Sequence, residues 1–400
     1  MHSSITYRNT GDFTVINKYA PDLTFKDSLL CLSHLRWNFV YQRPQHLMKR
    51  FATKYTVLYI EEPIYVDKKN AYLVSDEVKD GALVLVPHIP KNIDRKQEEV
   101  ILQSLVSDFI QNNNYNVKIK WYLTPMMLPW SKHIFSDIII YDCMDELSAF
   151  KNAPPQLKAL EKELLQMTNL VFTGGLSLYK AKSLSHLDVH LFPSSVDIPH
   201  FTKARGDLEI PFDQKNIPEP RIGFYGVIDE RLDIKLLKSL AISKPEWSFV
   251  IIGPVIKIDI NDLPQLPNIY YLGAKTYDEL PYYLCSWRVA LIPFIINEST
   301  KFISPTKTPE FLAAGLPVVS TPINDIVETY QTSEVVYTVD ATDLSWFIFA
   351  IDSALKDSKD KTKVYRKADF TLHGMSWDKT FIDMYKLVLK KQQEVINNVR

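Results

Sequence analysis

Residues 303–322, ISPTKTPEFLAAGLPVVSTP, place several hydrogen-bonding groups directly before a short apolar segment. These groups are three hydroxyl side chains and a cation: Ser304, Thr306, Thr308 and Lys307. The pattern predicts a helix that has either Pro305 or Pro309 at its first position, with the preceding hydroxyl residue as its cap. The free N–H groups of such a helix start, together with Lys307, favour an anionic ligand such as a diphosphate.

Glu310 lies about one turn into this predicted helix. Its carboxylate can accept hydrogen bonds from two hydroxyl groups of a ribose. The alternative is a structural role, in which the carboxylate stabilises the start of the helix. The residue types leave both interpretations open.

A second candidate for phosphate binding is in RIGFYGVIDERLD, residues 221–233. An apolar strand is predicted to end at Gly226, where the lack of a side chain permits a tight turn or the close approach of a ligand. Arg231 follows just before a helix start, and its guanidinium can bind a phosphate through two hydrogen bonds. The alternative is a surface arginine that pairs with Asp229 or Asp233.

Two more predicted strands of the second half also end at a glycine. WSFVIIGP ends at Gly253-Pro254, and the strand in NIYYLGAKTYDELPYYL ends at Gly273, shortly before a helix start that contains Tyr277. Bare turns at strand ends can accept a nucleobase through backbone groups. Purely structural turns explain the same pattern equally well.

The first half contains a basic and aromatic segment, HLRWNFVYQRPQHLMKRF, residues 34–51. It includes Arg36, Trp37 and Arg43 and lies in a stretch without acidic residues. One interpretation is a surface for anionic lipid head groups or for a phosphorylated acceptor. The other is an ordinary strand, loop and solvated helix.

The elements that position these residues are predicted from alternating β-rich and helical runs, which favour parallel sheets with crossover helices. In the first half the predicted strands are 29–32, 56–60, 82–86, 119–123, 138–141, 170–172 and 189–192. In the second half they are 221–225, 249–252, 269–272, 289–292, 318–320 and 335–339. The fold class is therefore α/β with two successive doubly wound domains. Ligands of such domains bind at the carboxyl ends of the strands, and a cleft between the domains is the expected site.

A chain of 400 residues is long for one hydrophobic core, which also favours two domains. The predicted parts are a polar N-terminal extension at 1–27, a first domain at 28–205, a linker at 206–220, a second domain at 221–376 and an amphipathic helix at 377–400.

Composition and missing motifs exclude several classes of protein. Apolar residues make up 46% and charged residues 23% of the chain, and the net charge of −1 gives no reason to expect nucleic acid as a partner. The 3 cysteines are too few for a disulfide framework or a zinc site. Neither G-x-G-x-x-G nor a P-loop motif occurs. No signal peptide and no apolar run of about 20 residues is found, so a cytoplasmic protein is expected.

The chain resembles the GT-B-fold, retaining-type nucleotide-sugar glycosyltransferases, in particular bacterial members of exopolysaccharide and teichuronic-acid-type assembly. In the second half the resemblance rests on RIGFYGVIDERLD, WSFVIIGP, NIYYLGAKTYDELPYYL, ALIPF and ISPTKTPEFLAAGLPVVSTP. In the first half it rests on WNFVYQRPQHLMKRFA, IIIYDCMDELSAF and LFPSSVDIPHF. The order and spacing of these motifs cover nearly the whole chain after about residue 27.

The resemblance implies two Rossmann-like domains, with the nucleotide-sugar held mainly by the second domain and the last helix crossing back to the first. It implies that Arg231 and Lys307 bind the diphosphate and that Glu310 binds the ribose. Asp142 and Asp145 in YDCMDE would face the sugar or the acceptor hydroxyl and are the candidates for a catalytic base. Their spacing differs from the D-x-D pattern that binds a metal, and arginine and lysine can neutralise the diphosphate without an ion, so no metal is expected. No other cofactor is expected either.

The expected function is transfer of a sugar from a UDP- or GDP-sugar to a hydroxyl of a glycan or lipid-linked acceptor. The reaction is expected to retain the anomeric configuration and to serve cell-surface polysaccharide synthesis, with the inner face of an anionic membrane as a further contact to be expected. Two alternatives stay open: a non-catalytic protein that binds a nucleotide-sugar or glycan, and a nucleotide-sugar epimerase on the same architecture.

Overall fold

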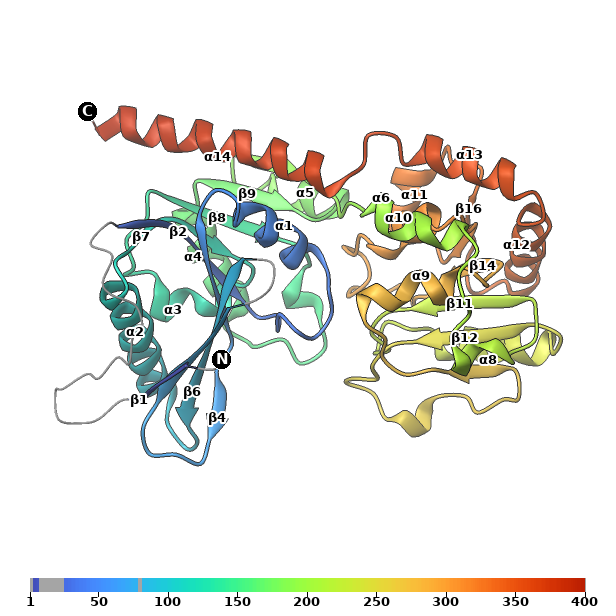
Figure 1. Ribbon diagram of the computed structural model, residues 1–400, viewed down its shortest axis with the longest axis horizontal. Helices are drawn as coiled ribbons and strands as arrows, with labels where there is room; N and C mark the ends of the chain where they lie inside the picture. The colour runs from blue at the N-terminus through green and yellow to red at the C-terminus, as the bar shows by residue number, and fades with distance from the viewer. Residues whose placement is uncertain (1–2, 7–24, 78–80, 400) are drawn as a thin grey trace. The chain divides into compact units, whose positions relative to one another are not determined.

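The computed structural model describes residues 3–6, 25–77 and 81–399 (Figure 1). The chain divides into two compact units. The first unit contains the described residues up to Gly174, the segment Leu178–Phe192 and the residues from Phe381 on. The second unit contains Gly175–Ser177 and Pro193–Thr380. In each unit helices pack against one sheet.

The first unit is built on a 10-stranded sheet with the strand order β1-β5-β6-β3-β2-β7-β8-β9-β10, in which β4 pairs with β6. Its strands are β1 (Ser3–Thr6), β2 (Lys26–Ser33), β3 (Thr56–Glu61), β4 (Ile64–Val66), β5 (Tyr72–Glu77), β6 (Ala82–Pro90), β7 (Tyr115–Tyr122), β8 (Ile138–Cys143), β9 (Leu170–Thr173) and β10 (Val189–Leu191). From β6 to β10 the neighbouring strands run parallel, whereas β5 is antiparallel to both β1 and β6.

The helices of the first unit are α1 (Arg43–Phe51), α2 (Arg95–Asn112), η1 (Pro125–Met127), α3 (Leu128–Ser131), η2 (Leu147–Ala149), α4 (Leu157–Met167) and, from Leu178 on, α5 (Leu176–Lys182). The last helix, α14 (Trp377–Val399), begins in the second unit and packs on the first from Phe381 on. There the Phe381 ring contacts that of Phe51 at 5.0 Å, and Lys391 forms an ion pair with Asp188 at 2.5 Å. The return of the C-terminal helix to the first unit is therefore confirmed.

The second unit is built on a 6-stranded parallel sheet with the order β13-β12-β11-β14-β15-β16. Its strands are β11 (Arg221–Tyr225), β12 (Ser248–Ile252), β13 (Ile269–Tyr271), β14 (Val289–Ile292), β15 (Val318–Ser320) and β16 (Val336–Thr338). Its helices are α6 (Ile198–Phe201), η3 (Thr202–Arg205), α7 (Phe212–Lys215), α8 (Ile234–Ser243), η4 (Ile260–Asp262), η5 (Tyr277–Glu279), α9 (Leu280–Leu284), α10 (Lys307–Ala313), α11 (Asn324–Tyr330), α12 (Leu344–Asp357) and α13 (Lys361–Thr371).

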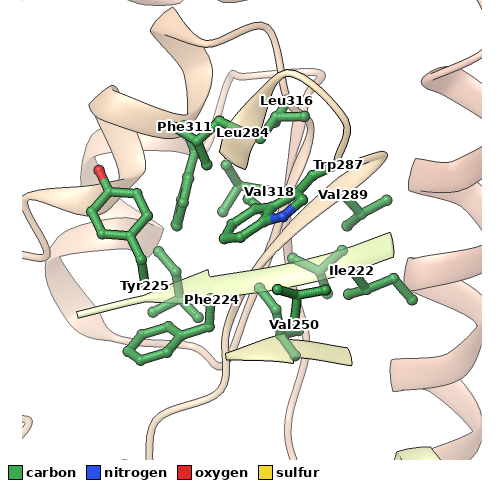
Figure 2. Packing of buried hydrophobic residues seen from close by; sticks show 14 of the residues in the cluster. Ile222, Phe224, Tyr225, Val250, Leu284, Trp287, Val289, Phe311, Leu316 and Val318 are labelled. Carbon is green, nitrogen blue, oxygen red and sulfur yellow. The ribbon is translucent and has the colours of Figure 1, made fainter. Parts of the chain in front are cut away.

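Strand β11 lies inside this sheet and carries buried side chains on both faces. Tyr225 and Phe224 leave β11 on opposite sides, and Phe311 from α10 lies near Tyr225 (Figure 2). The rings of Tyr225 and Phe311 meet edge to face at 5.0 Å. A buried parallel strand needs apolar residues on both faces, which explains the nearly continuous apolar run at this position.

Aspartates at the N-caps determine where several helices begin. The Asp94, Asp233, Asp343 and Asp360 side chains accept hydrogen bonds from the backbone N–H groups of the first turns of α2, α8, α12 and α13. Such caps satisfy N–H groups that have no partner within the helix. The Asp233 cap places the start of α8 directly after the loop that follows β11.

Two predicted parts of the chain differ from the structure, and two edge strands were not predicted. The extension at 1–27 contains β1 and the start of β2, and its residues 1–2 and 7–24 lie outside the described residues. The linker predicted at 206–220 is built into the second unit, because the buried Gln214 of α7 donates to the Tyr283 carbonyl and accepts from the Trp287 indole. The edge strands β4 and β5 had no clear signal in the sequence.

Lys120, on β7 in the middle of the first sheet, is a buried cation. Its side chain is 2% exposed, and Nζ donates to the Lys132 carbonyl at 3.2 Å. Burial lowers the pKa of Lys120 from 10.5 to about 8. Keeping this charge in the folded state at neutral pH therefore costs stability.

We expect Lys120→Met to raise the free energy of unfolding at pH 7 by on the order of 1–3 kcal/mol. Between pH 8 and 10.5 the folded protein has lost the Lys120 proton that the unfolded chain still holds, so the stability of the wild type rises with pH there. The advantage of the variant should shrink across this window in urea titrations. An advantage that is the same at pH 7 and pH 10 would contradict the assignment.

Candidate functional site

Helix α10 begins at Lys307 and has Thr306 as its N-cap. Its start therefore falls between the two predicted positions, and neither Pro305 nor Pro309 is the first residue. The Lys307 Nζ donates to the Thr306 hydroxyl at 3.1 Å. A cation and a hydroxyl thus lie together at the carboxyl edge of the second sheet, since α10 follows β14 and precedes β15.

The other two predicted hydroxyl residues differ in exposure. Ser304 is half-buried in the turn before α10. Thr308 is fully buried, and its hydroxyl has no hydrogen-bond partner among the described residues. The Thr308 hydroxyl is therefore closed to solvent here, whereas Ser304, Thr306 and Lys307 are partly open.

Glu310 forms the buried part of the site. It is 7% exposed, and the hydroxyl of Tyr225 at the end of β11 donates to its Oε2. Burial raises the pKa of Glu310 to about 7, against the lowering effects of Lys307 and of the Tyr225 hydrogen bond. The pKa of Tyr225 is raised well above its usual value, chiefly by burial, so its hydroxyl stays a donor.

Tyr277 borders the same group. Its ring stacks on His200 of α6 at 4.2 Å, and its carbonyl lies 3.0 Å from the His200 Nε2. The pKa of Tyr225 is raised by burial, by Glu310 and also by Tyr277. The two tyrosines are therefore close enough to interact electrostatically. The structure thus brings the predicted residues Tyr277, Glu310 and Lys307 together around Tyr225, which the sequence analysis did not select.

Two glycines bring the turns after β11 and β12 into contact. Gly226 and Gly253 have φ values of +145° and +147°. A Cβ atom on Gly253 would lie 1.7 Å from the Gly226 carbonyl oxygen, and one on Gly226 would lie 3.1 Å from Lys307 Cε. Gly253 is therefore required by packing, whereas Gly226 is favoured by its positive φ and leaves the space along which the Lys307 side chain lies.

Arg231 lies in the loop between β11 and α8. Isolated bridges from Ile228 to Val255 and from Leu232 to Phe294 tie this loop to the turns after the neighbouring strands β12 and β14. The guanidinium makes a bidentate ion pair with Asp229, with Nη2 2.7 Å from Oδ2 and Nε 2.8 Å from Oδ1. Pairing with Asp229 was the alternative left open by the sequence. A phosphate that binds Arg231 therefore has to share it with this carboxylate.

Glu230, between these two residues, was missed by the sequence analysis. Both carboxylate oxygens are shielded from solvent, and neither has a hydrogen-bond partner within the described part of the chain. Buried polar groups are normally paired, so an unpaired carboxylate indicates a ligand or water that completes the site. No sequence signal distinguishes Glu230 from other loop glutamates.

The predicted catalytic residue Asp142 has a different role in the structure. It is 0% exposed and forms an ion pair with Arg43, whose exposure is 2%, at 2.7 Å. The Arg43 Nε also lies 3.1 Å from each oxygen of the carboxylate, and Nη1 donates to the Phe192 carbonyl. A carboxylate enclosed in this way cannot reach an acceptor hydroxyl, so Asp142 and Arg43 hold α1, β8 and the end of β10 together.

The predicted surface for an acceptor or a membrane is not formed by its named residues. Arg43 is buried in the pair with Asp142, and Trp37 is 6% exposed with its ring edge on Tyr59 at 4.9 Å. Arg36 remains partly open but donates to Glu61 at 2.9 Å and to the Glu62 carbonyl at 2.6 Å. The aromatic and basic residues alternate in sequence because some of them point into the core.

Asp145 lies in the loop between β8 and η2. Its side chain is half-buried, and its carbonyl accepts the backbone N–H of Leu147 at 3.1 Å. The neighbouring Glu146 is committed to Lys182, with 2.7 Å between the charged atoms. Asp145 is therefore the more accessible of the two aspartates proposed as a base.

Within the ranges that the structure describes, no three His, Cys, Asp or Glu side chains are grouped so that they could hold a metal ion. Over the same ranges, none of the helices combines the length and apolar character that a membrane span requires.

The ionisation of Glu310 has a consequence for stability. Between its ordinary value of 4.5 and the folded value of about 7, the folded protein keeps a proton that the unfolded chain has lost. Stability therefore falls as the pH rises through this window. We expect Glu310→Gln to raise the free energy of unfolding at pH 8 by on the order of 2 kcal/mol, and to leave it nearly unchanged at pH 4.5. Denaturant unfolding at both pH values measures the difference, and equal effects at both would contradict the raised pKa.

Residues 219–357 match the model of a family described as glycosyl transferases group 1. The chain is also 29% identical, over 222 residues, to a candidate teichuronic acid biosynthesis glycosyltransferase, TuaH, of Bacillus subtilis (strain 168). This match covers 50% of the chain and 54% of the relative, so it spans about half the length of that protein.

Solved structures share the architecture over almost the whole chain. Sucrose-phosphate synthase from Thermosynechococcus elongatus matches with a TM-score of 0.68 and 13% identity, covering 91% of this chain and 98% of that one. Anabaena Alr3699/HepE, solved in complex with UDP and glucose, matches with a TM-score of 0.61 and 12% identity, covering 94% and 99%. At these identities the likeness concerns the fold, which is that of the GT-B glycosyltransferases with two Rossmann-like units.

Proposed function

We propose that this chain, whose residues 219–357 match the model of the group 1 glycosyl transferases, transfers a sugar from a nucleotide diphosphate donor to a hydroxyl acceptor. The observation that carries the proposal is the group Lys307, Tyr225 and Glu310 at the carboxyl edge of the second sheet. In this group a cation lies beside a buried carboxylate that can accept hydrogen bonds from hydroxyl groups. Both belong to the segment that matches the family. A diphosphate and a ribose present the complementary groups.

The diphosphate is the leaving group of the proposed reaction. When the bond between the anomeric carbon and the phosphate oxygen breaks, negative charge develops on that oxygen, and a fixed cation nearby lowers the barrier. Lys307, beside the Thr306 hydroxyl, fits this role, and Arg231 adds a second cation once its guanidinium is shared with Asp229. Ser304 and the backbone of residues 304–308 complete the proposed phosphate site.

The rest of the donor extends from this group. Glu310 accepts the ribose hydroxyls through its carboxylate, and the turns at Gly226 and Gly253 with Tyr277 border the nucleobase. Glu230 is placed in the loop that carries Arg231 and is the proposed contact for hydroxyls of the transferred sugar. UDP- and GDP-sugars are the donors to be tested first.

The acceptor hydroxyl attacks the anomeric carbon on the face that the diphosphate leaves, so the configuration is retained. Its proton passes to the departing phosphate oxygen, and Asp145 is the side chain proposed to assist. The acceptor belongs to a cell-surface glycan or its lipid-linked precursor. The partial similarity to a candidate teichuronic acid glycosyltransferase favours this class.

A thermal-shift screen with UDP-, GDP-, ADP- and dTDP-sugars tests the donor site. A ligand that binds only the folded state raises its stability by about 2.7 kcal/mol at a concentration of about 100 times Kd. We expect one nucleotide class to raise Tm in the wild type and in Lys301→Ala, whose lysine is exposed in the loop before α10, but not in Lys307→Ala. The absence of any shift with all four classes would overturn the proposal.

A non-catalytic binding protein remains the second candidate, because Arg231 is already paired with Asp229. The two functions differ in turnover. Release of nucleoside diphosphate above background in the wild type, abolished in Lys307→Ala, supports transfer or donor hydrolysis. Donor binding without turnover across a broad panel of glycan acceptors supports the binding protein.

A further inference from the structure

The Glu310 carboxylate is held by a tyrosine from a different element. Tyr225 is the last residue of β11 and is 5% exposed, and its hydroxyl donates to Oε2 of Glu310. Its ring is fixed edge to face on Phe311, the residue after Glu310, at 5.0 Å. The hydroxyl and the carboxylate are therefore positioned by the same packing contact between strand and helix.

The charged and titratable groups around Glu310 come from each element packed near it. Lys307 of α10 and Tyr225 of β11 act on Glu310 directly, and Tyr277 of η5 acts through Tyr225. His200 of α6 is stacked on Tyr277. Arg205 of η3 faces the other end of α10, where it donates to the Ala313 carbonyl at 2.8 Å and to that of Leu312 at 3.2 Å.

Lys307 and Tyr225 stabilise the charged form of the buried Glu310 carboxylate. Burial favours the protonated carboxyl, whereas Lys307 and the Tyr225 hydrogen bond favour the anion. Lys307 is also a proposed ligand of the diphosphate, and a bound diphosphate would draw its charge away from Glu310. Tyr225 then remains as the donor that supports the carboxylate when the site is occupied.

We infer that Tyr225 is a positioning residue for donor binding, because its hydroxyl orients the Glu310 carboxylate and favours the ionised form that accepts the ribose hydroxyls. The inference rests on the proposed function, which supplies the ribose as the ligand of Glu310. An ionised carboxylate accepts hydrogen bonds with both oxygens, whereas a protonated one uses one oxygen as a donor. Near neutral pH, Glu310 is protonated in a fraction of the ligand-free molecules. Binding of the ribose therefore releases this proton.

The experiment measures Kd of UDP-glucose and of GDP-mannose by calorimetry between about pH 6 and about pH 8.5. Both phosphates of a nucleotide-sugar are esterified and stay ionised over this range, so the titration belongs to the protein. For the wild type we expect affinity to fall below about pH 7, by up to about tenfold per pH unit. Glu310→Gln should bind weakly and without this pH dependence.

Tyr225→Phe preserves the ring and removes the hydroxyl. A hydrogen bond to a charged group corresponds to a shift of about one pH unit, so the midpoint of the affinity profile should rise by about that amount. Binding should be about 5- to 10-fold weaker at pH 7 and within about twofold of the wild type near pH 8.5. Tyr283→Phe is the matched control, since this buried tyrosine of the same unit bonds to Asp213 at 2.9 Å and should leave the profile unchanged.

The outcomes separate the two proposals. If a nucleotide-sugar binds the wild type but Tyr225→Phe has the same midpoint, or a loss of affinity that does not recover at high pH, the inference about Tyr225 is overturned and the donor site stands. If the wild type binds neither nucleotide-sugar at any pH tested, both are overturned. A deoxyribose donor of the same base should show a much weaker pH dependence, which identifies the ribose as the ligand.

Discussion

Lys307→Ala is expected to lower kcat/KM for sugar transfer by about 10²-fold or more, the usual effect of removing one group that stabilises charge in a transition state. Lys307 is the cation at the start of α10, beside the Thr306 hydroxyl and the Glu310 carboxylate. The measurement is initial-rate kinetics of nucleoside diphosphate release with a saturating acceptor. The loss should appear in KM, because Lys307 also holds the diphosphate of the bound donor, and in kcat, because the charge on the diphosphate grows as the bond to the sugar breaks.

Lys301→Ala provides a control with the same change of net charge. Lys301 lies in the loop before α10, with its side chain 50% exposed and paired only loosely with Glu298 at 3.6 Å. It should retain activity within about twofold of the wild type, as surface substitutions usually do. Arg231→Ala should resemble Lys307→Ala. Near-normal activity in both Arg231→Ala and Lys307→Ala would remove the basis for the diphosphate site.

The second large effect is expected in the first unit. Asp142→Asn should lower the free energy of unfolding by about 3–5 kcal/mol, because it leaves the buried Arg43 guanidinium without a compensating charge. The pair is sealed from solvent, and Arg43 makes a further hydrogen bond to the Phe192 carbonyl. Urea denaturation followed by fluorescence measures the loss, and a two-unit protein requires the transition of the first unit to be resolved.

Two controls identify the cause of that loss. Glu99→Gln removes an exposed ion pair with Arg95 on α2 of the same unit and should change stability by less than about 1 kcal/mol. Replacing both partners, as in Arg43→Met with Asp142→Leu, should restore much of the stability, because no buried charge is then left unpaired. Unchanged stability in Asp142→Asn, combined with lost transfer activity, would return Asp142 to the catalytic role that its position in the sequence suggested.

Much of the fold could be predicted from the sequence. The predicted strand at 221–225 agrees with β11 and that at 289–292 with β14, because buried parallel strands are short apolar runs bounded by polar turns. The antiparallel edge strands β4 and β5 were missed, since their residues are partly exposed and carry no continuous apolar signal. The polar segment 206–220 was expected to be a linker, yet Gln214 is buried there by hydrogen bonds to residues about 70 positions away.

The sequence by itself determined that Gly226, Lys307 and Glu310 follow predicted strands of one parallel sheet, because buried strands are short apolar runs and the polar turns after them are visible in the local sequence. Only the tertiary structure decided which polar groups meet. It joined Tyr225 to Glu310 and closed Arg43 on Asp142, residues separated in the chain by 85 and 99 positions. It also paired Arg231 with Asp229 and left Glu230 without a partner in the described structure. The contacts of Tyr225 with Glu310 and of Arg43 with Asp142 depend on packing between distant elements, and local residue patterns carry no information about them. The Arg231–Asp229 pair is local, and the structure selected it from the alternatives that the sequence left open.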